Sequence, residues 1–132
     1  MIYTIINIDF SSDTPIYTQL CDQIIIGIAS SGLVHGEALP SVRLMAQNIG
    51  VHAHTVNKAY LILSREGFIT IDRRSGCRIA NVIPEAGDSF KNALRQKLLP
   101  IVASAAGRHM PVDAFKELCD EIYRSLNQET GG

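Results

Sequence analysis

Several features that define common protein classes are absent from this sequence of 132 residues. Its three cysteines, Cys21, Cys77 and Cys119, are scattered. Their spacing predicts neither a disulfide framework nor a zinc site and favours a reduced, cytoplasmic setting. The N-terminus has no basic segment, so we expect no signal peptide. No apolar run is long enough to cross a bilayer, which argues against a membrane protein.

Signatures of catalysis are absent as well. The sequence contains no glycine-rich phosphate loop, no nucleophile elbow and no cluster of carboxylates or metal ligands. A chain of this length suits one domain with a short appendage and leaves no room for a second large catalytic or ligand-binding domain. We therefore predict a protein that is not an enzyme and that uses no cofactor.

Excess charge of either sign is absent, since the net charge is only −1. The distribution is more informative, because residues 1–33 contain no lysine or arginine. Residues 34–80 carry a net positive charge, with Arg43, Lys58, Arg65, Arg73, Arg74 and Arg78 against Glu37, Glu66 and Asp72. A locally basic middle segment is compatible with nucleic-acid binding, which requires only one basic face.

The N-terminal third predicts a strand followed by a helix. Ile2–Phe10 is rich in β-branched and apolar residues and is expected to form a short strand. Thr14 followed by Pro15 is typical of a helix start, with a hydroxyl cap before a proline at the first helical position. Apolar residues then recur every four positions, which predicts a helix with one buried stripe: Ile16, Leu20, Ile24 and Ile28. Gly32 is expected to end this helix.

The middle of the chain predicts a winged helix-turn-helix. Ser41 should cap a short helix reaching about Asn48, Gly50 should form a tight turn, and a further helix is expected over about His54–Glu66. Gly67 should stop that helix. Two β-prone segments, Phe68–Ile71 and Cys77–Ala80, flank the basic sequence Asp72–Gly76 and predict a hairpin with a basic tip.

The C-terminal third predicts a pair of helices. Capping by Asp88 or Ser89 should start one helix, Gly107–Pro111 should form a turn, and Val112–Leu126 should form the other helix. Each helix has one apolar stripe, and the two stripes together present more apolar surface than two helices can bury against each other. We therefore expect dimerisation through these residues: Phe90, Leu94, Leu98, Ile101, Phe115, Leu118, Ile122 and Leu126.

The predicted architecture is thus mainly α-helical with a small β wing. We expect a DNA-binding winged helix-turn-helix domain at 1–80, a linker at 81–87, a dimerising αα-hairpin at 88–127 and a flexible tail at 128–132. The first residues of the second helix of such a motif face base edges in the major groove, and a wing with arginines can grip phosphate or the minor groove. The candidate DNA-contact residues are Arg43, His52, His54, Thr55, Asn57, Lys58, Arg73, Arg74 and Gly76.

Structural explanations compete with some of these assignments. Thr55 could serve only as a helix cap, and the arginines could be ordinary solvated charges. His52 and His54 could suggest a metal, but two histidines do not complete a tetrahedral site, so we predict none. Cys77 could be a redox sensor, but a plain strand residue is the favoured interpretation.

Several short motifs, in order and spacing, resemble the GntR family of bacterial regulators over Pro15–Ala80. They are Leu39–Arg43 (LPSVR), Met45-Ala46, Gly50-Val51, Thr55–Tyr60 (TVNKAY) and Ser64–Ile69 (SREGFI). The short two-helix tail resembles the YtrA subfamily, whereas other branches carry a larger effector or aminotransferase-like domain. Departures from the family pattern at His52, Ala53, His54 and Arg74 bear on the operator sequence and not on the fold.

The resemblance implies a homodimer built by the two tail helices, acting as a repressor that is often encoded beside transporter genes. A twofold dimer would bind a palindromic operator in double-stranded DNA. The tail has little volume for a metabolite, so we expect either no small-molecule effector or one bound between subunits. The alternative is a winged helix that binds protein instead of DNA, which should lack the basic wing and the polar start of the second motif helix.

Overall fold

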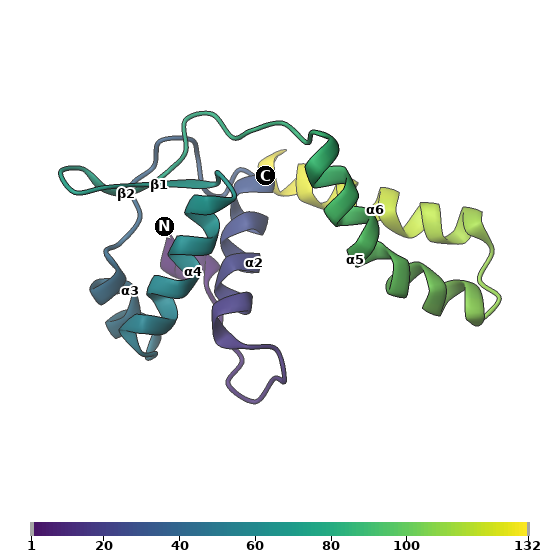
Figure 1. Cartoon of the computed structure of the whole chain (residues 1–132), viewed down its shortest axis with the longest axis horizontal. Coiled ribbons are helices and arrows are strands. Elements are labelled where there is room, and N and C mark those ends of the chain that lie inside the picture. Colours follow the sequence, from purple (N-terminus) through teal and green to yellow (C-terminus); the bar gives the residue numbers. More distant parts are fainter. Residues whose placement is uncertain (1, 132) are drawn as a thin grey trace. The chain divides into compact units, whose positions relative to one another are not determined.

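The computed structural model describes residues 2–131 and shows a mainly helical chain with one two-stranded antiparallel sheet (Figure 1). The chain divides into two compact units: Met1–Ile83 together with Gln128–Gly132, and Pro84–Asn127. Within the part of the chain that the structure describes, no helix is long and apolar enough to cross a membrane.

The first unit is built around three helices and a hairpin. After the short α1 (Ile2–Ile5), the helices are α2 (Ile16–Ala29), α3 (Val42–Ile49) and α4 (Ala53–Arg65). The helix-turn-helix and the wing are therefore confirmed. One core joins all of these elements, because α4 packs on both α2 and α3, and its fully buried side chains include Leu20, Ile24, Met45, Val56, Tyr60 and Leu63.

The predicted strand over Ile2–Phe10 is wrong. Ile2–Ile5 form a helical turn, and the residues that follow pair with glutamine side chains of α2 instead of a strand. Ile2 and Ile6 are nevertheless buried in the core. The apolar, β-branched pattern correctly marked a buried segment, but the nearest neighbour of that segment is a helix, so no β ladder can form.

The predicted ends of α2 also differ from the structure. Pro15 and not Thr14 is the N-cap residue, and no side chain caps the helix there. The carbonyl of Thr14 instead accepts a hydrogen bond of 2.9 Å from Gln19 Nε2. At the other end, the helix stops at Ala29 and the left-handed residue is Ser31 (φ 63°), so Gly32 does not terminate it.

The glycine and serine signals around the helix-turn-helix are confirmed. Ser41 Oγ accepts a hydrogen bond of 3.1 Å from the Leu44 amide and caps α3. Gly50 has φ 73° and Gly67 has φ 88°, a left-handed conformation that glycine adopts without steric cost. These two residues end α3 and α4 respectively, so the turn chemistry was readable from the sequence.

The wing consists of β1 (Ile69–Asp72) and β2 (Gly76–Ile79), with Ile69 opposite Ile79 and Asp72 opposite Gly76. The segment before α3 adds a third short pairing along β2. The Leu39 amide donates to the Cys77 carbonyl at 2.8 Å, and the Ile79 amide donates to the Glu37 carbonyl at 2.8 Å. The wing is therefore anchored on both sides of β2.

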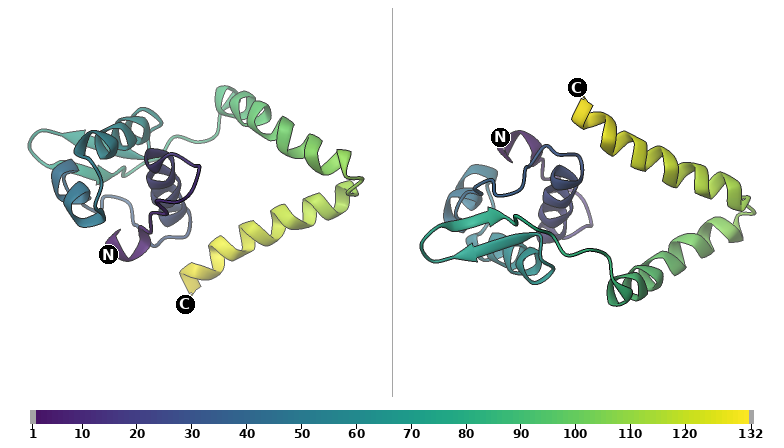
Figure 2. Two further views of the ribbon diagram at one scale, coloured as in Figure 1. Left: turned by 90° about the horizontal axis from the view of Figure 1, so that it is seen from below. Right: turned by 90° about the horizontal axis from the view of Figure 1, so that it is seen from above.

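The second unit consists of α5 (Asp88–Gly107) and most of α6 (Val112–Gly131), which runs past its predicted end at Leu126. Gly87 is the N-cap of α5, so neither Asp88 nor Ser89 caps that helix. Asp88 instead lies in the first turn, where its charge is favourable to the helix dipole. In both views of Figure 2 the two helices diverge from the turn that joins them.

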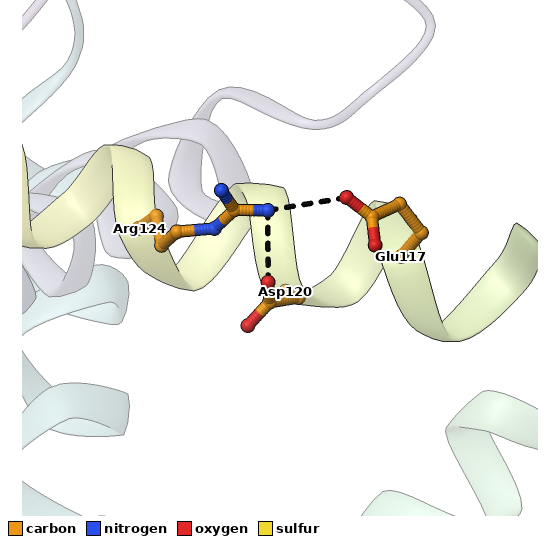
Figure 3. Close-up of polar contacts among 3 residues, drawn as sticks. All are labelled: Glu117, Asp120 and Arg124. Carbon is orange, nitrogen blue, oxygen red and sulfur yellow. Dashed lines mark hydrogen bonds and ion pairs between the residues drawn. The ribbon is translucent and has the colours of Figure 1, made fainter. Parts of the chain in front are cut away.

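Charged residues of α6 occupy the side opposite its apolar stripe. Arg124 Nη2 lies 2.8 Å from Asp120 Oδ2 and 3.2 Å from Glu117 Oε1 (Figure 3). Helical periodicity places these three residues about half a turn from Phe115, Leu118 and Ile122. The helix is therefore amphipathic, with a polar face that suits water and an apolar face that does not.

Candidate nucleic-acid interface

The start of α3 presents one cation to solvent. Arg43 lies in the first turn of α3 and is exposed, while Met45 and Ala46 face the core. The serine cap and the two buried residues fix the orientation of this turn, so Arg43 projects from a rigid element. A guanidinium at this place can form paired hydrogen bonds with a phosphate or with the edge of guanine.

The exposed face of α4 carries most of the other candidates. Val56, Ala59, Tyr60 and Leu63 are buried. Residues on the opposite side of the helix are exposed at i, i+3, i+4 and i+7: His54, Asn57, Lys58 and Leu61. Leu61 was not predicted, although its spacing from His54 in the sequence could have indicated it. This face therefore carries three side chains that can form hydrogen bonds and one apolar side chain, Leu61.

The two histidines and Thr55 lie at the N-terminal end of α4. His52 is the N-cap residue, so Thr55 is not the cap, and Thr55 is half-buried. The rings of His52 and His54 stack, with centroids 5.5 Å apart and an interplanar angle of 16°. Among the described residues, no group of three or more His, Cys, Asp or Glu side chains could hold a metal ion.

Two contacts made by other residues position this face. Tyr60 donates a hydrogen bond of 2.8 Å from its hydroxyl to the carbonyl of Pro40, which ties α4 to the segment before α3. The Lys58 ammonium lies 3.9 Å from the ring centroid of Tyr17 on α2. Sequence reasoning missed Tyr17, because a contact between residues so far apart along the chain has no local pattern.

The wing tip places the remaining candidates at the end of the hairpin. Arg73, Arg74 and Gly76 are all exposed. The Arg74 amide donates to Asp72 Oδ1 at 2.9 Å, and Gly76 adopts φ 76°, which together shape the turn. Arg78 behaves differently from the tip arginines, because its Nη1 donates to the Gly36 carbonyl at 3.1 Å and braces the base of the wing.

Cys77 lacks the properties of a redox-sensing thiol. It is half-buried on β2, and burial raises its pKa above the ordinary value of 9.0. Since the thiolate is the reactive form, this environment makes the thiol less reactive. This half-buried environment agrees with the interpretation of Cys77 as a strand residue.

The predicted dimerisation residues all lie in the second unit. Phe115 and Leu126 are partly buried, whereas the others are exposed within the single chain: Phe90, Leu94, Leu98, Ile101, Leu118 and Ile122. Two further apolar residues of α5, Leu99 (69% exposed) and Val102 (41% exposed), widen this surface beyond the predicted stripe. A large exposed apolar surface is a common feature of interaction sites.

Comparison with known proteins relates this chain to a family. The model for bacterial regulatory proteins of the gntR family matches residues 16–79. The HTH-type transcriptional repressor YtrA of Bacillus subtilis is 31% identical over 118 residues, which cover 89% of this chain and 91% of that protein.

Two solved structures extend the likeness to the fold. YtrA from Sulfolobus acidocaldarius, a GntR-family transcription factor, is 40% identical with a TM-score of 0.62, covering 75% of this chain and 98% of that one. A protein from Listeria monocytogenes, described as a transcriptional antiterminator, is 28% identical with a TM-score of 0.83, covering 96% and 93% of the two chains. The chain therefore belongs to the GntR family of bacterial regulatory proteins and is a transcriptional regulator of its YtrA subfamily, with a DNA-binding winged helix-turn-helix domain.

Proposed function

We propose that this protein is a homodimeric repressor that binds a palindromic operator. The observation that carries the proposal is the exposed face of α4, where His54, Asn57 and Lys58 lie opposite a fully buried apolar side. Such a helix can enter the major groove and present polar side chains to base edges without disturbing the core. Asn57 has the two amide groups that pair with adenine, and His54 can bond to guanine.

The arginines of the wing tip supply contacts that are independent of sequence, and Arg43 adds a contact to a base edge or a phosphate. Arg43 at the start of α3 and the tip residues Arg73 and Arg74 are exposed cations of the same unit. Cations at such places neutralise phosphates and release counterions, which is the main source of affinity in many protein–DNA complexes. Gly76 allows the backbone of the wing tip to approach the DNA closely, because it has no side chain.

The apolar surface of the second unit supports the proposed dimer. Phe90 (54% exposed), Leu118 (47%) and Ile122 (60%) need a cover that the single chain does not provide. A second copy with the same surface is the simplest cover and gives a twofold axis. The two copies of α4 would then meet half-sites about one helical turn apart, ~34–36 Å.

Repression is proposed because the similar Bacillus subtilis protein is a transcriptional repressor. The YtrA-type resemblance also points to the genes of a membrane transporter as the regulated operon. A dimer bound to a promoter represses transcription simply by occupying the site. If a small-molecule effector exists, we expect it between the subunits, because the second unit has two diverging helices (Figure 2) and none of its described residues is fully buried.

The test is a fluorescence anisotropy titration against the DNA upstream of the protein's own gene, at a stated salt concentration. We expect saturable binding of one dimer per palindrome and much weaker binding to a scrambled sequence of equal length. Asn57→Ala should weaken binding to the operator and leave binding to the scrambled DNA unchanged. Equal affinity for both sequences would favour the alternative, a winged helix that binds protein.

A further inference from the structure

Tyr17 on α2 contacts Lys58, one of the residues on the exposed face of α4. The residue lies in the first turn of α2 and is half-buried against the core. Its ring lies below the ammonium of Lys58, with Nζ 3.9 Å from the ring centroid. This distance is well inside the range of a favourable cation–π interaction, about 6 Å.

The contact is held by a rigid junction between two helices. One turn further along α2, the thiol of Cys21 donates a hydrogen bond of 3.5 Å to the carbonyl of Ala59, the residue after Lys58. Cys21 and Ala59 are both buried. The first half of α2 therefore lies directly beside the first half of α4, which keeps the partly buried Tyr17 ring within reach of Lys58.

The direction of the Lys58 side chain decides what it can contact. A free lysine has a flexible four-carbon stem and loses conformational freedom when it is fixed. Here the ring draws the ammonium sideways toward α2 instead of straight outward from α4. For a helix lying in the major groove, the sides of the helix face the phosphates that line the groove, while the outermost residues face the bases.

We propose that Tyr17 is a positioning residue that directs Lys58 to a backbone phosphate of the operator and away from the bases. The inference rests on the proposed function, because it assumes that α4 enters the major groove. It adds a residue of α2 to the interface and divides the exposed face of α4 into base-reading residues, His54 and Asn57, and a phosphate contact, Lys58.

The experiment is a double-mutant cycle on the full-length protein. Titrations of wild type, Tyr17→Leu, Lys58→Ala and the double variant against operator and scrambled DNA are repeated over a range of salt concentrations. Lys58→Ala should weaken binding to both DNAs and lower the log–log salt slope by about one. Tyr17→Leu should weaken binding about two- to fivefold in the wild-type background and cause no further loss in the Lys58→Ala background.

The conservative variant separates positioning from support of the core. Tyr17→Phe keeps the ring and should keep wild-type affinity. In NMR spectra, the Lys58 ε-methylene protons should be shifted upfield by the ring in wild type and in Tyr17→Phe, but not in Tyr17→Leu. If the leucine variant fails to fold, Tyr17→Met, which is apolar and unbranched, replaces it in the cycle.

Three results would overturn the inference while leaving the proposed function intact. They are an equal loss from Tyr17→Leu in both backgrounds, tighter binding by Tyr17→Leu, and a Lys58→Ala effect limited to the operator with an unchanged salt slope. Failure of wild type to bind its operator in preference to scrambled DNA would instead overturn the proposed function.

Discussion

The side chain of Gln19 exchanges two hydrogen bonds with the backbone of Asp9, as a neighbouring strand would. The Asp9 amide donates to Gln19 Oε1 at 2.9 Å, and Gln19 Nε2 donates to the Asp9 carbonyl at 3.0 Å. Gln23, one turn later, forms the same pair with Asn7 at 2.6 and 2.8 Å. Two carboxamides on α2 thus replace the β ladder that the N-terminal segment lacks.

Replacing Gln19 should destabilise the first unit. Gln19 is only 9% exposed, and its Nε2 also donates to the Thr14 carbonyl. Gln19→Ala leaves these backbone groups without their partner, which costs about 1–3 kcal/mol of unfolding free energy when such groups are shielded from water. Urea denaturation followed by circular dichroism measures the change.

Gln23→Ala is the matched control for this prediction. Its two hydrogen bonds are exposed, so water can replace them, and the loss should stay below about 1 kcal/mol. Equal losses of unfolding free energy for the two variants would show that the two glutamines contribute alike and that burial of Gln19 adds no stability.

Arg43→Ala should affect DNA binding and leave folding unchanged. The side chain is exposed at the start of α3. Loss of a contact to a base should cost ~1–3 kcal/mol of operator affinity. Anisotropy titration and a thermal melt measure the two quantities. An unchanged affinity would remove Arg43 from the interface.

The double variant Arg73→Ala, Arg74→Ala should weaken binding to every DNA sequence. Both residues are exposed at the wing tip, where they can release counterions from phosphates. The log–log salt slope should fall by about one or two. A slope equal to that of wild type would mean that the wing does not touch DNA.

Leu118→Asp should convert the proposed dimer into a monomer. A carboxylate placed in the proposed apolar contact between subunits costs several kcal/mol, which dissociation avoids. The first unit has a separate core and should stay folded. Size-exclusion chromatography with light scattering should show a monomer that keeps its helical circular dichroism and loses tight operator binding.

Arg124→Asp is the control on the other side of α6. Arg124 pairs with Glu117 and Asp120 on the charged face, and all three side chains are largely exposed. Loss of such pairs costs little, so this variant should remain dimeric. A Leu118→Asp protein that melted earlier but still ran as a dimer would place dimerisation elsewhere.

Cys21 should make the stability of the first unit depend on pH in the alkaline range. Burial, with a smaller effect of Asp22 and Glu66, raises the pKa of its thiol from the ordinary 9.0 to about 11. Because the folded-state pKa is the higher one, the contribution to stability is complete below pH 9 and is lost as pH rises through 11. The difference in unfolding free energy between wild type and Cys21→Ala should be constant below pH 9 and should shrink above it.

Reducing agent must be present in those measurements, and urea denaturation at several pH values provides the data. Other groups that titrate in this range, such as lysines and tyrosines, are common to both proteins and cancel in the difference. A difference that stays constant up to pH 11 would mean that the Cys21 thiol ionises alike in the folded and unfolded chain.

Local chemistry in the sequence by itself determined the helix-turn-helix, the wing and the family. The Ser41 cap, the left-handed Gly50 and Gly67 and the buried stripe of α4 act within a few residues of one another, so their pattern can be read along the chain. The same holds for the exposed positions of Arg43, Asn57 and Arg73, because periodicity and turn position place them outside the core.

Only the tertiary structure decided the contacts between distant segments. The β-prone Ile2–Phe10 segment lies against α2 and bonds to Gln19 and Gln23, because the fold offers it a helix and no strand. Tyr17 meets Lys58 because α2 packs on α4. The energy of such contacts depends on which surfaces the chain brings together, and a local pattern carries no information about a partner 41 positions away.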